Sequence, residues 1–84
     1  MAKQVVYTNH ASTVIRQREL SVEWIERTLA SPLWTEPDPN DGSVVRFFGN
    51  VPERGGRMLR VAVVETEAEF RIVSAFLDRR ARPK

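Results

Sequence analysis

The spacing of apolar positions changes about halfway along this chain of 84 residues. In the first third, apolar residues recur every three or four positions, as on one face of an α-helix. From Ser43 onward they alternate with polar residues, as in strands that bury one face. The pattern therefore predicts short helices in the N-terminal third and a sheet built mainly by the second half of the chain.

Residues that can cap a helix mark the start of both predicted helices. Thr8 or Asn9 follows a short apolar strand over 4–7, and Ser21 precedes a second helical pattern that runs to about Ala30. Ser, Thr and Asn at this position accept hydrogen bonds from backbone N–H groups of the first turn. The sequence thus predicts two helices, separated by a break shortly before Ser21.

The rest of the chain predicts one loop and three strands. Residues 31–43 hold three prolines and a glycine, which is typical of a loop, and Trp34 within them is expected to fold back over one end of the core. Alternating segments over 44–48, 58–64 and 69–77 predict strands. In the last strand, strict alternation places Ser74 on the same face as Ile72.

These elements predict an α+β fold, with two short N-terminal helices packed on one face of a three- to four-stranded antiparallel β-sheet. The fourth strand would be the segment over 4–7, at an edge. A chain of this length allows a single domain, spanning 1–84. The four-residue connection before the last strand is short enough to require antiparallel pairing.

Composition excludes several kinds of site. The chain has no cysteine and one histidine, so disulfides, cysteine zinc sites and multi-histidine metal sites are excluded, and neither a metal nor another cofactor is expected. No segment is apolar over a length that could serve as a signal peptide or span a bilayer. We therefore expect a soluble, cytoplasmic protein that does not associate with membranes.

The net charge of +2 is unevenly distributed, because four positive charges lie within the last six residues. A basic tail over 78–84 could contact phosphate groups and give a salt-dependent affinity for nucleic acid. The alternative is a solvated, frayed terminus. The sequence leaves both open.

His10, at the start of the first predicted helix, is the main candidate for chemistry. An imidazole can accept or donate a proton near neutral pH, and free N–H groups at a helix N-terminus attract anions. The structural alternative is an imidazole that packs at the junction of helix and sheet.

Four arginines and one serine are the remaining candidates. Arg46, Arg60 and Arg71 fall on successive strands and could form a basic stripe that binds a polyanion, although solvated arginines are common on sheets. Arg18 follows His10 by eight residues, where it could contact the same extended ligand or tie the two helices together. Ser74 is a hydroxyl within an apolar run.

The chain carries four short motifs: Tyr7-Thr8-x-His10-Ala11, Arg18-x-Leu20-Ser21, Leu59-Arg60-Val61 and Ile72-Val73-Ser74-Ala75-Phe76. Over roughly residues 5–77 they resemble the small bacterial family called domain of unknown function 4258. In that resemblance His10 matches the family histidine, Arg18 the arginine before the second helix, and Ser74 the hydroxyl residue of the last strand. The family often has an arginine where this chain has Val14, and its hydroxyl residue is usually threonine.

That family is similar to the RelE-type and barnase-like ribonuclease toxins, so the resemblance implies metal-independent cleavage of RNA. His10 would transfer a proton at a ribose 2′-hydroxyl, Arg60 or Arg46 would stabilise the phosphorane, and Ser74 would orient the phosphate. The expected partners are RNA and an antitoxin or other protein. The residues expected to bind the substrate are Arg18, Arg46 and Arg71.

A non-catalytic module is the second hypothesis. It would bind a protein or nucleic acid through the uncovered face of the sheet, and could do so as a homodimer. Phe47, Val73 and Ala75 would supply apolar contacts on that face.

Overall fold

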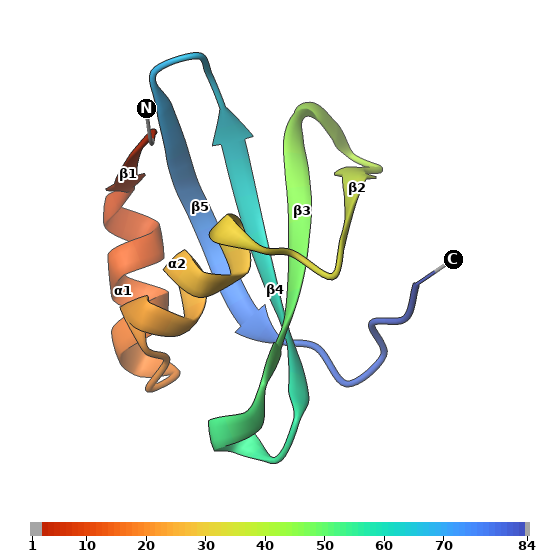
Figure 1. Cartoon of the computed structure of the whole chain (residues 1–84). Helices are drawn as coiled ribbons and strands as arrows, with labels where there is room; N and C mark the ends of the chain where they lie inside the picture. Colours follow the sequence, from red (N-terminus) through yellow and green to blue (C-terminus); the bar gives the residue numbers. More distant parts are fainter. Residues whose placement is uncertain (1–2, 84) are drawn as a thin grey trace.

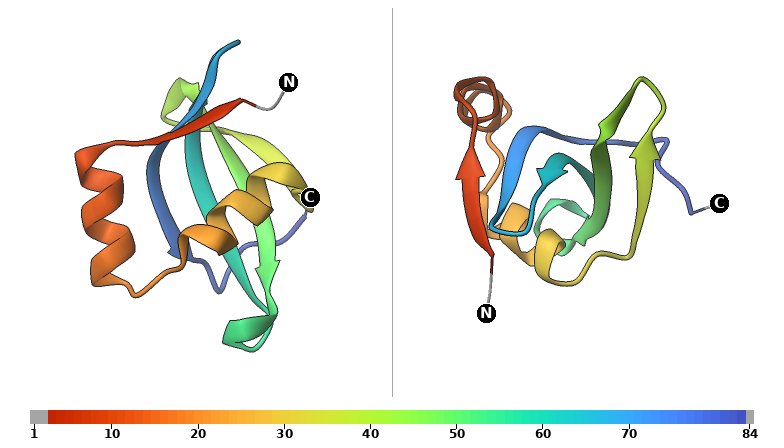
Figure 2. Two further views of the ribbon diagram at one scale, coloured as in Figure 1. Left: turned by 60° about the vertical axis from the view of Figure 1, so that its left-hand side comes forward. Right: turned by 90° about the horizontal axis from the view of Figure 1, so that it is seen from above.

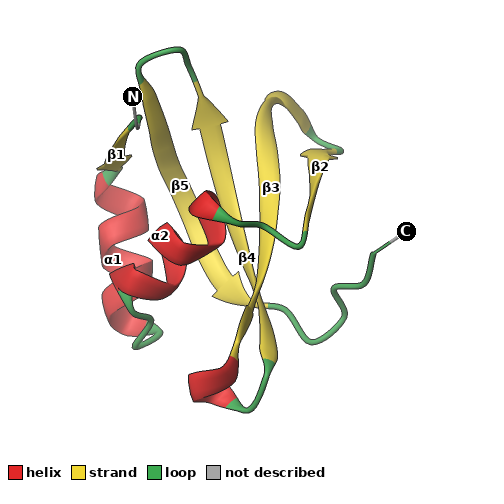
Figure 3. Ribbon diagram, in the orientation of Figure 1, coloured by secondary structure: helices red, strands yellow, loops and turns green. Residues whose placement is uncertain are grey.

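The computed structural model describes residues 3–83 and contains one five-stranded sheet with two α-helices (Figures 1 and 3). Met1, Ala2 and Lys84, which belong to the predicted domain and tail, lie outside the described residues. The strands follow the order β1-β5-β4-β3-β2 across the sheet. The elements are β1 (Gln4–Tyr7), α1 (Asn9–Gln17), α2 (Val22–Ala30), β2 (Trp34–Asp38), β3 (Asp41–Val51), a 3-10 turn η1 (Pro52–Arg54), β4 (Arg57–Glu65) and β5 (Glu69–Leu77).

The prediction of an α+β fold is confirmed, but the sheet differs from the predicted one in two respects. It has five strands, and β1 pairs with β5 in parallel, whereas the other neighbours are antiparallel. The additional strand is β2, which lies in the segment expected to be a loop. Pro37 does not prevent this, because a proline is tolerated in an edge strand.

Both helices begin at the expected caps. The Thr8 hydroxyl accepts a hydrogen bond from the Ala11 N–H, and the Ser21 hydroxyl accepts one from the Glu23 N–H. Glu19 follows α1 with a positive φ of 55°, which turns the chain toward α2.

The sequence suggested that both helices pack on one face of the sheet. In the structure they do not share one face. α2 crosses β3 and β4, whereas α1 lies along β5 beside the edge of the sheet (Figure 2). We call the face under α2 the inner face and the opposite one the outer face. The reason for the difference is β1, which pairs with β5 and leads directly into α1, so that the helix starts at the sheet edge.

The core fills the inner face between α2, α1 and the sheet. Its fully buried residues include Ile25 of α2 and Leu59 and Val61 of β4, while Ala11 and Ile15 bring one side of α1 into the same cluster. The outer face carries no helix. It presents the even-numbered residues of β3 and β4, because side chains alternate along a strand.

Candidate functional site

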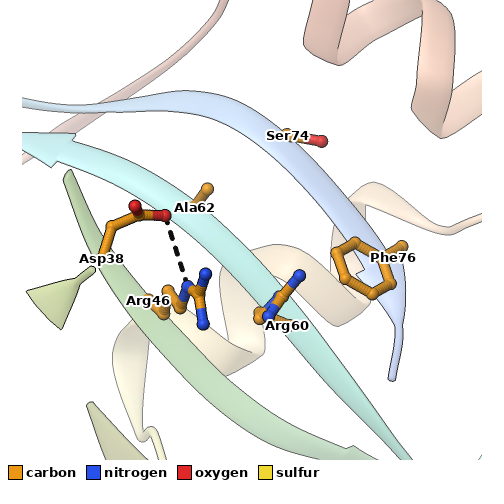
Figure 4. Close-up of a pocket in the computed structure, with 6 residues that line it drawn as sticks. All are labelled: Asp38, Arg46, Arg60, Ala62, Ser74 and Phe76. Carbon is orange, nitrogen blue, oxygen red and sulfur yellow. Dashed lines mark hydrogen bonds and ion pairs between the residues drawn. The ribbon is translucent and has the colours of Figure 1, made fainter. Parts of the chain in front are cut away.

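A pocket of about 190 Å³ lies on the outer face, across the middle of the sheet (Figure 4). The strand register assembles it: Arg46 pairs with Ala62, Ala62 pairs with Ser74, and Arg60 pairs with Phe76. β2 adds Asp38 from the far edge. Two of the predicted catalytic residues, Arg60 and Ser74, and one predicted binding residue, Arg46, thus line the same pocket.

Arg46 is held by two carboxylates of β2. Its Nε lies 3.3 Å from Asp38 Oδ2, and its Nη1 lies 3.8 Å from Glu36 Oε1. The backbone N–H of Asn40, and after it the positive charge of Arg46, lower the pKa of the Asp38 carboxyl below its ordinary value. The carboxylate therefore stays ionised at neutral pH and fixes the plane of the guanidinium.

Arg60, the second arginine of the pocket, contacts a carboxylate and an aromatic ring. Its Nη1 lies 3.4 Å from Asp78 Oδ2, and its guanidinium carbon lies 4.1 Å from the centre of the Phe76 ring. Burial, and then the like charge of Arg46, lower the pKa of Arg60. Two partly buried guanidinium groups therefore repel each other in this pocket.

Ser74 reaches the outer face because β5 contains a β-bulge. Ala62 pairs with Ser74 but the next residue of β4, Val63, pairs with Ile72, so Val73 has no partner on β4. The expectation that Ser74 shares a face with Ile72 is thus wrong, since Ile72 is fully buried in the core. In Figure 4 the Ser74 hydroxyl projects from β5 away from the two guanidinium groups. It has no hydrogen-bond partner within residues 3–83.

Arg18 also lies near the Phe76 ring. Its Nη1 donates a hydrogen bond of 2.8 Å to the carbonyl of Ala75, and its guanidinium carbon lies 5.7 Å from the centre of the Phe76 ring. The first contact ties the end of α1 to β5, whereas the structural alternative for Arg18 expected it to join the two helices. The second leaves the cation beside a ring that also lines the pocket.

His10 is exposed at the second position of α1 and does not line this pocket. The Thr8 N–H donates to the carbonyl of Ile72, so α1 starts level with that residue and runs along β5. From rises of about 1.5 Å per helical residue and about 3.3 Å per strand residue, His10 and Ser74 lie within about 4 Å of each other along the strand direction.

His10 also shares a side of α1 with Arg18. Residues 10, 14 and 18 are four apart and form one stripe along a helix. Because the last of them reaches Phe76, the stripe faces the outer side of β5. Helical spacing from Arg18, the C-cap residue of α1, therefore predicts that the imidazole lies on the same side of the molecule as the pocket.

Other residues chosen from the sequence lie elsewhere. Arg71 pairs with Glu69 at 3.0 Å and does not line the pocket. Phe47 and Ala75 are core residues, so they cannot provide the outer apolar surface expected in the second hypothesis. Phe47 faces inward by alternation, and the bulge at Val73 turns Ala75 inward as well.

Sequence reasoning missed the carboxylates that hold the arginines. Glu36 and Asp38 fall in the segment predicted as a loop, and Asp78 follows the last strand. The sequence did contain a sign of this strand, because Trp34, Glu36 and Asp38 alternate with Thr35 and Pro37. In the structure the burial of these five residues alternates in the same way. The segment was nevertheless predicted as a loop because it contains three prolines.

The family described as Domain of unknown function (DUF4258) matches residues 7–77. The chain belongs to this family. No match was found among curated proteins or among solved structures. The match confirms the family resemblance carried by the four motifs, and it assigns no activity.

Within residues 3–83, no helix is long and apolar enough to cross a membrane. The same residues contain no group of three or more side chains that could together hold a metal ion.

Proposed function

We propose that the outer-face pocket binds a phosphodiester group of RNA, and that this DUF4258 domain cleaves RNA in the manner of the RelE-type and barnase-like ribonucleases. The observation that carries the proposal is the convergence of Arg46 and Arg60, two partly buried cations, on one small pocket. Burial, and after it the repulsion by Arg46, lower the pKa of Arg60, and a bound phosphate oxygen would offset that repulsion.

Both arginines retain hydrogen-bond donors for a ligand. A guanidinium has five N–H groups, and the contacts with carboxylates use the Nε and Nη1 of Arg46 and the Nη1 of Arg60. Carboxylates that fix a guanidinium plane leave the other edge preorganised for a phosphate. Preorganised donors of this kind stabilise the extra charge of a phosphorane more than that of the ground-state phosphate.

His10 is assigned the proton transfer. In the proposed reaction the imidazole removes the proton of a ribose 2′-hydroxyl, and the 2′-oxygen forms a bond to phosphorus. The bond from phosphorus to the 5′-oxygen then breaks, and that oxygen takes a proton from water. The products are a 2′,3′-cyclic phosphate and a 5′-hydroxyl. Ser74, which lines the pocket, is assigned the orientation of a phosphate oxygen.

The test is incubation of single-stranded RNA with the protein in the presence of a chelator. We expect cleavage to cyclic phosphate products, and no cleavage of RNA whose 2′-hydroxyls are methylated. His10→Ala should slow the reaction by about 100-fold or more, the usual contribution of a general base. Arg60→Gln should cost about 100-fold or more, as the loss of one transition-state donor does elsewhere.

Arg71→Gln is the matched control. Arg71 is also a strand arginine with a carboxylate partner, Glu69, but it does not line the pocket. This variant should cleave at the rate of the unsubstituted protein. If the folded protein binds RNA but does not cleave it, the domain is a binding module and His10 has no catalytic role. A protein that neither binds nor cleaves RNA would overturn the proposal.

A further inference from the structure

A second pocket, of about 410 Å³, adjoins the first and shares Phe76 with it. It is lined by Arg18, Leu20, Phe76 and Leu77. Its volume falls within the range of about 300–1,000 Å³ that small-molecule sites occupy, whereas the first pocket is smaller than that range. The two pockets therefore suit ligand groups of different size and chemistry.

The walls of the second pocket are apolar apart from one cation. Phe76 and the two leucines provide apolar surface, and Arg18 lies beside the ring with its guanidinium fixed by the Ala75 carbonyl. Phe76 therefore has guanidinium groups from two elements near it, Arg18 from α1 and Arg60 from β4. Aromatic rings and arginine planes are the groups on which bases of single-stranded nucleic acid stack.

We infer that the second pocket holds the nucleobase of the nucleotide whose phosphate lies in the first. This inference rests on the proposed function, since it takes the occupant of the first pocket to be an RNA phosphate. Phe76 is the link between the two pockets, because a nucleotide that stacks on this ring has its phosphate directed toward Arg46 and Arg60. The walls offer an aromatic ring for stacking but few hydrogen-bonding groups. The subsite therefore does not discriminate between bases.

The experiment compares two small ligands that differ only in the base. Adenosine 5′-monophosphate and ribose 5-phosphate are titrated into the isotope-labelled protein, and the dissociation constants are measured from amide chemical shifts. We expect the nucleotide to bind about tenfold more tightly than the sugar phosphate, within the range measured for stacking of one base. The amide chemical-shift changes that the nucleotide causes and ribose 5-phosphate does not should fall on residues 18–20 and 76–77.

Two variants separate the base from the phosphate. Phe76→Leu should remove the difference in affinity between the nucleotide and ribose 5-phosphate, because the two ligands share every contact with the first pocket. Arg18→Gln should act in the same direction, and it provides a second variant if the first does not fold. Its matched control is Arg16→Gln, an exposed arginine of the same helix, which should have no effect.

The outcomes distinguish this inference from the proposed function. Equal affinities for the two ligands would refute the base subsite and leave the phosphate pocket in place. A nucleotide advantage that persists in both variants would place the base elsewhere, and would also refute it. Failure of both ligands to bind would contradict the subsite and the phosphate pocket together.

Discussion

Arg46 and Arg60 illustrate how single residues of this chain depend on partners from other strands. Their side chains are 19% and 23% exposed, so each charge would be costly without a nearby carboxylate. The sequence predicts that both arginines lie on strands, and alternation predicts that Arg60 faces away from the core. It does not predict Asp38, Glu36 or Asp78 as partners, because those contacts depend on the pairing of β2 and on the path of the chain after β5.

Tyr7 provides a direct test of side-chain placement at this scale. Burial, then the negative charge of Glu26, and then a hydrogen bond to the same carboxylate raise the pKa of Tyr7 to about 12. The folded state therefore holds the phenol proton more tightly than the unfolded state, whose tyrosine pKa is about 10. The resulting stabilisation is fully present below pH 10 and is lost as the pH rises through 12.

Tyr7 is the only tyrosine, so an ultraviolet absorbance titration reports it alone among phenols. We expect a midpoint near pH 12 while circular dichroism shows that the fold persists. Glu26→Gln should move the midpoint toward 10 without reaching it, because burial is the largest cause. A midpoint near 10 in the folded, unsubstituted protein would show that Tyr7 is solvated and that its contact with Glu26 does not form.

At the scale of elements, the helices and the long strands could be predicted, and the sheet edges could not. Thr8 and Ser21 mark both helix starts, and β5 was predicted with its exact limits, Glu69–Leu77. The pairing of β1 with β5 joins opposite ends of the chain, which no local pattern encodes. The bulge at Val73 reverses the two faces within one strand, and a strictly alternating pattern gives no sign of it.

The contact between α2 and β3 depends on a glycine that sequence analysis did not single out. A Cβ added to Gly49 would lie 2.3 Å from Thr28 Oγ1 and 2.9 Å from its methyl carbon. Thr28 is 3% exposed and its hydroxyl donates to the Trp24 carbonyl, so it has little room to move. The helix can pack this closely on the strand only because residue 49 has no side chain.

Gly49→Ala should therefore lower the free energy of unfolding by about 1–3 kcal/mol, the usual cost of overpacking. Gly42→Ala is the matched control, because a Cβ there would meet nothing within 4 Å, and it should change stability by less than about 0.5 kcal/mol. Chemical denaturation of the two variants gives both values. Equal stabilities would mean that α2 lies farther from β3 than the structure has it.

At the scale of the whole molecule, two arginine-lined places within residues 3–83 are candidates for contact with RNA. One is the outer-face pocket, where Arg46 faces two carboxylates and Arg60 faces one. The other is a cleft of about 340 Å³ between the β3–β4 turn and the C-terminal segment, where Arg57 and Arg79 are exposed and form no ion pair within residues 3–83. Asp78 lies between the two, since it lines the cleft and pairs with Arg60.

RNA binding at these two places would differ in its dependence on salt. A site in the cleft and tail would contact phosphates only through solvated charges, and its affinity would fall steeply with salt. A site in the pocket would also use donors that are fixed and partly desolvated. The sequence alone named the strand arginines as candidates and left the role of the tail open, and it does not show that Arg46, Arg60 and Ser74 converge.

Mapping of bound RNA on the protein surface tests the central claim most directly. The protein is titrated with a short single-stranded RNA whose 2′-hydroxyls are methylated to prevent cleavage, and the backbone amide and arginine side-chain signals are followed by NMR. We predict the largest changes at Arg46, Arg60 and Ser74, with loss of those changes in the Arg46→Gln/Arg60→Gln double variant. Changes confined to residues 79–83 and the β3–β4 turn, with the pocket signals unmoved, would contradict the account.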